Sequence, residues 1–177
     1  MRELTESETR VLFEKLSKYI GRNITDLIDR PDEPFCFRLQ KDRVYYVSEK
    51  LAKLASNVSR DNLLSLGVCM GKFTKSGKFN LHITALDILA QYALWLKPSG
   101  EMSYLYGNHV LKAHIQKMSE DCPQHQGVII CSANDQPMGF AVSARAAVEC
   151  KTLEPTAIVG YHQADLGEYL RGEETLA

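Results

Sequence analysis

Residues 64–83 read LSLGVCMGKFTKSGKFNLHI, and this stretch predicts a β-hairpin. Apolar residues alternate with smaller ones up to Met70, and Phe79, Leu81 and Ile83 later alternate with polar residues. An alternation with a period of two residues places the apolar side chains on one face of a strand. Between the two runs, Lys75-Ser76-Gly77 predicts a turn in which the glycine supplies a positive φ. The stretch therefore favours an antiparallel sheet in the first half of the chain.

The segments before this hairpin predict a helix and a second hairpin. Thr5 and Glu8 have the spacing of a capping box, apolar residues follow at helical intervals, and Gly21 is a natural helix end. Strands are expected over 35–39 and 44–47, joined by a short polar connection.

Two further helices are expected around residues 48–93. Ser48 is a good helix N-cap. Thr84 and Asp87 again have the spacing of a capping box, before a helix that would carry Leu86, Leu89, Ala90 and Ala93. Because the composition changes beyond this point, we place a domain boundary near 93–96, between an N-terminal domain over 1–93 and a C-terminal domain over 94–177.

The second half of the chain is richer in expected strands. Strands are predicted over 94–96, 128–131, 138–142 and 157–162, with turns at 97–100 and 134–137, a short helix over 111–118 and a last short helix carrying Leu166, Tyr169 and Leu170. The pattern as a whole predicts an α+β protein.

The charge of the chain is nearly balanced in total but unevenly distributed. Its 177 residues carry 21 Lys and Arg and 22 Asp and Glu, a formal net charge of −1. Residues 1–93 hold 15 basic and 12 acidic residues, whereas 94–177 hold 6 basic and 10 acidic residues. The total excludes a histone-like basic chain and an acidic disordered tail. The basic excess of the first half still requires an explanation.

The sequence contains no constellation that indicates catalysis. It has no G-x-S-x-G, P-loop, G-x-G-x-x-G or H-E-x-x-H motif. Cys122 and His125 have a metal-ligand spacing but no second matching pair, and His162 with Asp165 could at most orient a proton. We therefore expect no catalytic residues, no bound metal and no cofactor.

The sequence also indicates the redox environment of the protein and whether it carries a membrane segment or a secretion signal. The five cysteines are an odd number without a C-x-x-C pair, which favours reduced thiols. No apolar run approaches the roughly 20 residues that span a bilayer. Acidic residues stand where a secretion signal needs an apolar core. We expect neither a membrane segment nor a secretion signal.

Lysines concentrate on the hairpin of residues 71–79. Lys72, Lys75 and Lys78 lie there with two interleaved phenylalanines. Lysine side chains neutralise phosphates, and exposed aromatic faces stack on unpaired bases. The alternative is a solvated, charge-protected turn whose phenylalanines belong to the core.

A second candidate stretch is YLYGNHVLK, residues 104–112. It combines aromatic residues, a glycine that allows close backbone approach and side chains that can contact base edges. The alternative is a turn glycine flanked by core tyrosines.

Several segments of the sequence together resemble one protein family. The segments 43–48, 71–75, 81–87, 106–112 and 162–169 are similar, in order and over essentially the whole chain, to the Nip-seven family of ribosome biogenesis factors. The resemblance implies an N-terminal antiparallel sheet with packed helices, followed by a C-terminal PUA-like mixed β-barrel. It also implies a non-catalytic protein of the nucleus and nucleolus that binds precursor rRNA, pre-60S particles and other assembly factors, and is a monomer outside the particle.

The resemblance also implies an RNA-binding face. In PUA domains this face includes the glycine loop before the second strand, which corresponds to Gly107, Asn108 and His109, with Lys112 nearby. The basic segment that follows a later strand in archaeal relatives corresponds here to a stretch with only Arg145 and Lys151 as basic residues. Together with the acidic balance of 94–177, this predicts modest RNA binding shared between the two domains.

Two other functional classes remain open. The chain could be a protein-interaction adaptor in pre-ribosomal particles whose RNA contact is incidental, which the acidic second half supports. An enzyme, such as a thiol hydrolase or an RNA-modifying protein, would need a catalytic centre that the sequence does not show.

Overall fold

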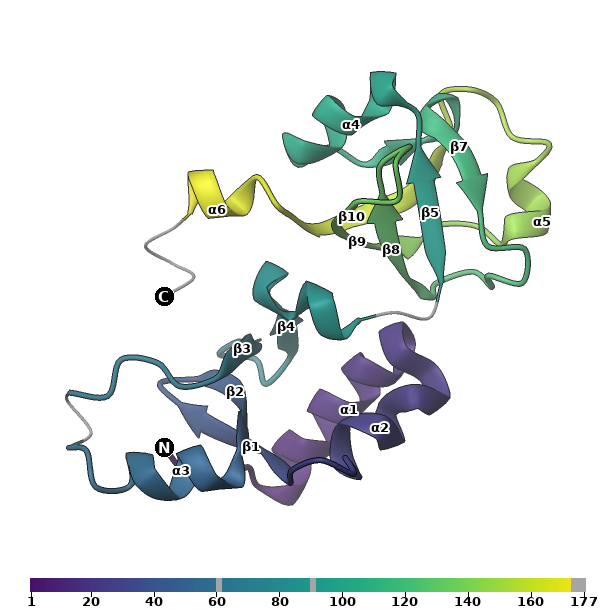
Figure 1. Cartoon of the computed structure of the whole chain (residues 1–177). Coiled ribbons are helices and arrows are strands. Elements are labelled where there is room, and N and C mark those ends of the chain that lie inside the picture. The colour runs from purple at the N-terminus through teal and green to yellow at the C-terminus, as the bar shows by residue number, and fades with distance from the viewer. Residues whose placement is uncertain (60–61, 90–91, 173–177) are drawn as a thin grey trace. The chain divides into compact units, whose positions relative to one another are not determined.

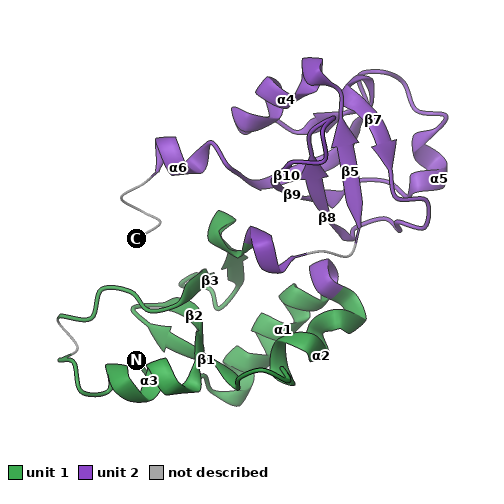
Figure 2. Ribbon diagram, viewed as in Figure 1, with its two compact units in different colours: residues 1–17, 21–85, 174–177 green, residues 18–20, 86–173 purple. Residues whose placement is uncertain are grey.

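The computed structural model describes residues 1–59, 62–89 and 92–172. Its contacts divide the chain into two compact units (Figure 2). The first comprises residues 1–17 and 21–85, and the second comprises 18–20 and 86–172 of the described chain. No helix within the described residues is both long enough and apolar enough to cross a membrane.

The first unit contains a four-stranded antiparallel sheet in the order β1-β2-β3-β4 (Figure 1). Its elements, in chain order, are α1 (Glu6–Ile20, whose last turn clusters with the second unit), η1 (Gly21–Ile24), α2 (Thr25–Ile28), β1 (Phe35–Gln40), β2 (Arg43–Ser48), α3 (Glu49–Ala55), β3 (Val68–Phe73), β4 (Phe79–Leu81) and the start of η2 (Ile83–Ile88).

The two predicted hairpins share this sheet. Lys41 and Asp42 connect β1 to β2 with φ values of 49° and 66°, the positive φ pair of a type I′ turn. Gly77 has φ 77° in the turn between β3 and β4, as the sequence predicts. Strand β3 pairs with β2 as well as with β4, so the basic residues of both hairpins lie on one sheet.

Helices α1 and α3 cover opposite faces of strand β1. The capping box of α1 is confirmed, with the Thr5 hydroxyl accepting from the Glu8 amide and the Glu8 carboxylate accepting from the Thr5 amide. Phe13 of α1 packs edge-on against Phe37, with ring centroids 5.7 Å apart. The next residue, Arg38, lines a cavity beneath α3. Neighbouring residues of a strand point to opposite faces, so the sheet is covered on both sides.

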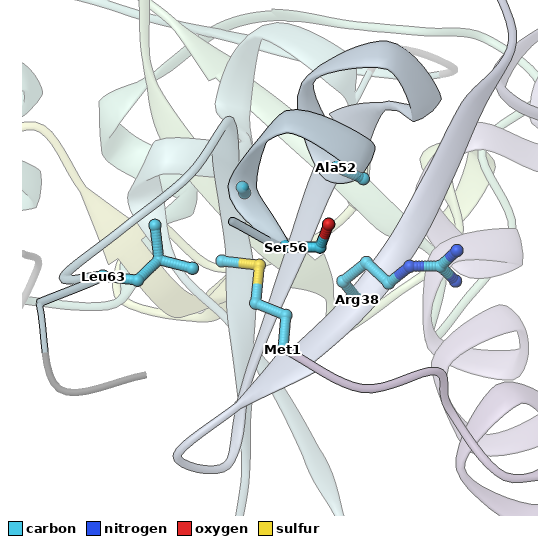
Figure 3. Close-up of a pocket in the computed structure, with 6 residues that line it drawn as sticks. Met1, Arg38, Ala52, Ser56 and Leu63 are labelled. Carbon is cyan, nitrogen blue, oxygen red and sulfur yellow. The ribbon is translucent and has the colours of Figure 1, made fainter. Parts of the chain in front are cut away.

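That cavity has a volume of about 70 Å³ (Figure 3). Its lining comprises Met1, Arg38, Ala52, Ala55, Ser56 and Leu63. The Arg38 guanidinium forms an ion pair of 3.1 Å with Glu3. Ser48 caps α3 as predicted, because its hydroxyl accepts from the Leu51 amide at 3.4 Å.

The predicted helix after Thr84 is wrong in type. The structure has a 3-10 helix over Ile83–Ile88, and the predicted member Ala90 lies outside the described residues. Thr84 does not cap a helix, because its hydroxyl donates to the carbonyl oxygen of Cys69 in β3. Ala93 belongs to a strand instead.

The second unit is a six-stranded mixed sheet in the order β6-β10-β9-β8-β5-β7 (Figure 1). Its elements are β5 (Ala93–Leu96), α4 (Pro98–Leu105), β6 (Val110–Leu111), η3 (Lys112–His114), β7 (Ile115–Met118), β8 (Gly127–Cys131), β9 (Pro137–Ser143), α5 (Ala147–Cys150), β10 (Ile158–Asp165) and α6 (Glu168–Arg171). Strands β5 and β8 run parallel, and the other pairs are antiparallel.

This sheet curls into a nearly closed barrel. Its two edge strands, β6 and β7, are joined by the three residues of η3, which cannot span a flat sheet of six strands. The interior holds Leu94, Leu96, Val128 and Ile130, which are wholly buried. The prediction of an α+β protein with an N-terminal antiparallel sheet and a C-terminal mixed barrel is confirmed.

Two predictions in this half are wrong. Residues 97–100 are not a turn, because Pro98 opens α4; the fixed φ of proline suits the first position of a helix. Residues 111–118 are not a helix, and form the end of β6, η3 and β7. Pairing of β7 with β5 decides the conformation of the latter segment, and such a partner is invisible in a local pattern.

Candidate nucleic-acid interface

The lysine hairpin has the geometry that its sequence predicts. Lys72 lies at the end of β3, and Lys75 and Lys78 lie on the turn that follows; all three side chains are exposed. The Thr74 amide donates to the carbonyl oxygen of Lys78 at 2.8 Å, and the Gly77 amide donates to that of Thr74 at 2.9 Å. These bonds hold the lysines on a defined turn. The hairpin can therefore present three cations to a phosphate backbone.

For Phe79 the stacking hypothesis is wrong, and the alternative of a core phenylalanine is confirmed. Phe79 is 4% exposed, Phe73 is half-buried, and their ring centroids lie 5.0 Å apart at an angle of 58°. The two rings pack on each other beneath the turn. Phe79 cannot stack on a base, so the exposed lysines are the main groups that this hairpin offers to RNA.

Positive charge also extends from the hairpin into the sheet. Arg43 of β2 is the cross-strand partner of Lys72. Burial lowers the pKa of the half-buried His82, and the charges of Arg43 and Lys72 lower it further. The imidazole thus reports a positive potential at this end of the sheet.

A groove of about 480 Å³ runs beside the lysine turn. Lys75, Phe73 and Gly77 line one part of it, and Glu8 and Asp42 bring acidic groups to the same groove. Glu8 forms a two-bond ion pair with Arg2, which lowers the pKa of its carboxyl to about 2. The cationic surface is therefore the turn itself, and the groove is mixed in charge.

In the second unit, the glycine loop follows the end of α4. Gly107 has φ 89°, and a Cβ added there would meet no atom within 4 Å. The Asn108 side chain donates to the Ser103 carbonyl oxygen at 3.1 Å, which fixes the loop against the helix. Gly107, Asn108 and His109 are all exposed. The loop is thus ordered by hydrogen bonds and open to a ligand.

His109 lies against the edge of β10. Its Nδ1 accepts from the backbone amide of His162 at 3.1 Å, and its ring packs edge-on against Tyr161 at 5.6 Å. Tyr161 is 40% exposed and was not predicted as a site residue. The alternation of the predicted strand 157–162 gives no signal for it, because it places Tyr161 on the same side as Val159, which is wholly buried.

Lys112 and Lys151, distant in sequence, line one groove of about 470 Å³. Lys117 also lines it and lies 4.8 Å from the centroid of the Trp95 ring, a cation–π distance. Glu120 and Asp121 line the same groove. Lys117 was missed because nothing in its local sequence separates it from any other exposed strand lysine.

Arg145 is exposed in the segment before α5. The charges of Lys112 and Arg145 both act on the thiol of Cys150, whose pKa is nonetheless raised by burial. These two cations therefore gather near the end of α5, where Lys151 follows. The loop of Gly107 to His109 does not line this groove, so the predicted residues of the second unit form two separate patches.

The other chemical groups of the sequence have structural roles. The Asp165 carboxylate is fully buried and accepts from His162 Nε2 at 2.6 Å, Arg171 Nη2 at 2.8 Å and the Gly167 amide at 2.7 Å. With three donors it fastens α6 to the end of β10.

The five cysteines share a raised thiol pKa. Burial is the main cause that raises the pKa of each of the five thiols, Cys36, Cys69, Cys122, Cys131 and Cys150. A thiol of raised pKa is a poor nucleophile at neutral pH. Cys122 is buried, and no cluster of three or more His, Cys, Asp or Glu side chains suited to a metal occurs in the part of the chain that the structure describes.

The fold and these basic patches define a class of protein: a sheet domain joined to a PUA barrel. Residues 1–83 match the family of the NIP7/UPF0113 pre-PUA domain, and residues 92–174 match the UPF0113 PUA domain. The chain is 65% identical to the 60S ribosome subunit biogenesis protein nip7 of Schizosaccharomyces pombe and 61% identical to NIP7 of Saccharomyces cerevisiae, over 99% of each chain. The chain belongs to the NIP7 family of 60S ribosome subunit biogenesis proteins.

Solved structures show the same fold at low sequence identity. A conserved PUA domain protein from Thermoplasma acidophilum has a TM-score of 0.57 at 15% identity, covering 96% of this chain and 95% of its own. A hypothetical protein from Pyrococcus horikoshii has a TM-score of 0.60 at 11% identity, covering 98% of each chain. These structures confirm the fold, and the family models with the 65% and 61% identical relatives confirm the family resemblance of the sequence.

Proposed function

We propose that this protein is a non-catalytic RNA-binding assembly factor, acting in maturation of the large (60S) ribosomal subunit and processing of its precursor rRNA. It works in the nucleus, in the nucleolus, on pre-60S particles together with other assembly factors, and it is a monomer outside the particle. Family membership supports the assembly role. The observation that carries the RNA contact is the rigid hairpin with Lys72, Lys75 and Lys78 exposed together.

RNA contact is divided between the two domains, expected over 1–93 and 94–177. In the first domain, the lysine hairpin supplies phosphate contacts without base stacking. In the second, the loop of Gly107, Asn108 and His109 meets bases, and Lys112, Arg145 and Lys151 supply a second set of phosphate contacts. Phosphate contacts position an RNA, whereas contacts to base edges select its sequence.

The salt dependence of RNA binding tests this proposal. The full chain and a variant with Lys72, Lys75 and Lys78 changed to Ala are titrated with a labelled single-stranded RNA oligonucleotide at several salt concentrations. Each lost phosphate contact lowers the log–log slope by roughly 0.7, so the triple variant should lose about 2. A double variant, Lys50→Ala/Lys53→Ala, removes exposed lysines of the same domain and should leave the slope unchanged. An unchanged slope for the triple variant removes the hairpin from the RNA interface.

A second candidate function is a protein-interaction adaptor with incidental RNA contact. The specific observation that favours it is the acidic balance of 94–177, with 10 acidic and 6 basic residues. An adaptor would enter pre-60S particles normally in the triple lysine variant and would show no RNA binding at physiological salt.

A further inference from the structure

The short helix α3 turns its small apolar residues toward the sheet and its large ones outward. Ala52 and Ala55 line the cavity against the sheet, together with Met1 and Leu63 (Figure 3). The larger residues Leu51 and Leu54 are 48% and 65% exposed. A surface helix normally turns its large apolar side chains toward the core.

The exposed residues form one continuous row, which we call the α3 stripe: Leu51, Leu54 and Val58. They stand three and four positions apart, the spacing that places side chains on one face of a helix. Beyond the last helical residue, the amides of Asn57 and Val58 still donate to carbonyl oxygens three residues earlier, which continues the turn. Val58 is 45% exposed.

Packing of the domain does not explain the stripe. A cavity of about 70 Å³ remains beneath α3, so a larger side chain at Ala52 or Ala55 could fill space that is left open. Burial of a larger apolar side chain in such a space would stabilise the fold. The helix instead exposes its larger apolar side chains, and contiguous exposed apolar residues are a mark of interaction surfaces.

The charged residues beside the α3 stripe indicate the charge of a partner that could bind there. Lys50 and Lys53 flank it with side chains 79% and 81% exposed. Their acidic neighbours, Glu33 and Glu49, lie at 3.8 Å and 4.0 Å, the outer limit of an ion pair. Such exposed pairs contribute little, so both ammonium groups can turn to acidic groups of a partner.

We propose that the α3 stripe is a docking site for an amphipathic helix of another assembly factor, one with aliphatic residues on its inner face and Asp or Glu at its flanks. Helices dock by aliphatic anchors at three- and four-residue spacing. A second copy of this chain would place lysines against lysines. RNA would find no aromatic or arginine side chain on the stripe to stack on a base. The inference rests on the proposed assembly role.

A synthetic peptide tests the chemistry of the site directly with the full-length protein. Three labelled 18-residue helical peptides are compared. The first has leucines at positions i, i+3 and i+7 flanked by glutamates, the second has the same leucines flanked by lysines, and the third has the glutamates but serines in place of the leucines. Only the first should bind. Leu51→Asp/Leu54→Asp should weaken its binding by roughly tenfold or more, because each buried leucine is worth more than the 1.4 kcal/mol of one tenfold step.

Matched control variants distinguish binding at the α3 stripe from non-specific binding elsewhere on the surface. Lys50→Ala/Lys53→Ala should weaken the peptide several-fold and reduce its salt dependence, whereas Lys72→Ala/Lys75→Ala, with the same charge change, should leave it unaffected. Leu170→Asp alters a leucine that is 92% exposed elsewhere and should also have no effect. Equal binding of the acidic and basic peptides, or no loss in Leu51→Asp/Leu54→Asp, overturns the proposal.

Crosslinking in cells then identifies the occupant. A benzophenone amino acid is placed at position 54, in cells whose own NIP7 relative has been replaced by this chain. Co-sedimentation of the unaltered chain with pre-60S particles is measured first, and its failure would refute the assembly role itself. If the chain enters particles, the crosslinked peptide should belong to an acidic amphipathic helix of another protein. A crosslink to rRNA or to this chain, or no crosslink within particles, overturns the docking site and leaves the assembly role standing.

Discussion

Arg43 and Lys72 stand directly opposite each other across strands β2 and β3. Side chains in such positions share one face of the sheet, with Cβ atoms about 5 Å apart, and like charges there are destabilising. The lysine turn follows one residue after Lys72. With Lys75 and Lys78 on that turn, four basic residues lie at this end of the sheet, and the proposed contact with RNA phosphates would offset the repulsion between them.

Removing the charge of Lys72 should therefore separate stability from binding. Lys72→Gln should leave the free energy of unfolding unchanged or raise it by up to about 1 kcal/mol, because the cross-strand repulsion disappears. RNA binding should weaken and its salt slope should fall by roughly 0.7. Urea denaturation and an RNA titration on the same preparation measure both effects. A variant that is clearly less stable and binds RNA normally would show that Lys72 has a structural role instead.

His82 provides a second, spectroscopic report on the same surface. Burial and the charges of Arg43 and Lys72 lower the pKa of its imidazole from 6.5. When phosphates neutralise those charges, part of this effect is lost and the pKa should rise. An NMR titration of the His82 ring proton with and without saturating RNA measures the shift. An unchanged pKa would mean that no phosphate lies near Lys72.

The same lowered pKa sets the direction of a pH effect on stability. Below about pH 6.5 the unfolded chain takes up a proton at His82, while the folded protein does so only at a lower pH. The contribution of His82 to stability is therefore present above pH 6.5 and is lost as the pH falls through the folded pKa. His82→Gln should flatten the decline of the unfolding free energy between pH 7 and pH 5.

Much of the first unit could be predicted because its signals are local. The capping box of Thr5 and Glu8, the N-cap of Ser48 and the turn glycine Gly77 each act within four residues, and each is confirmed. The alternation that correctly placed Phe79 on one face of β4 also implied that it was buried. For Phe79 the structure therefore agrees with the alternative of a core phenylalanine.

The second unit was harder to predict because its site and two of its elements depend on distant partners. Lys112 and Lys151 meet in one groove only when the barrel closes. Strand β7 exists because β5 pairs with it, and the helix-like sequence of 111–118 gives no sign of that pairing. Pro98 carried a usable signal, because proline opens helices as readily as it forms turns.

Two glycines of the second unit should respond very differently to alanine. Gly107 has φ 89° and open space around it, so Gly107→Ala costs only backbone strain, about 1–2 kcal/mol. At Gly139 an added Cβ would lie 2.2 Å from the Ala164 carbonyl oxygen and 2.7 Å from the Tyr104 hydroxyl. Gly139→Ala must shift a strand and should cost about 3 kcal/mol or more. Thermal denaturation of the two variants compares them directly, and equal losses would contradict this assignment.

The Gly107 variant also tests the proposed role of its loop. Strain at Gly107 should displace Asn108 and His109 from their hydrogen bonds with Ser103 and His162. If these residues contact bases, Gly107→Ala should weaken RNA binding without changing its salt slope, because phosphate contacts are kept. Lys112→Ala/Lys151→Ala should do the reverse and lower the slope by roughly 1.4 while leaving the preference among RNA sequences unchanged. Identical effects of the two variants on slope and on sequence preference would mean that the loop and the groove do not have separate roles.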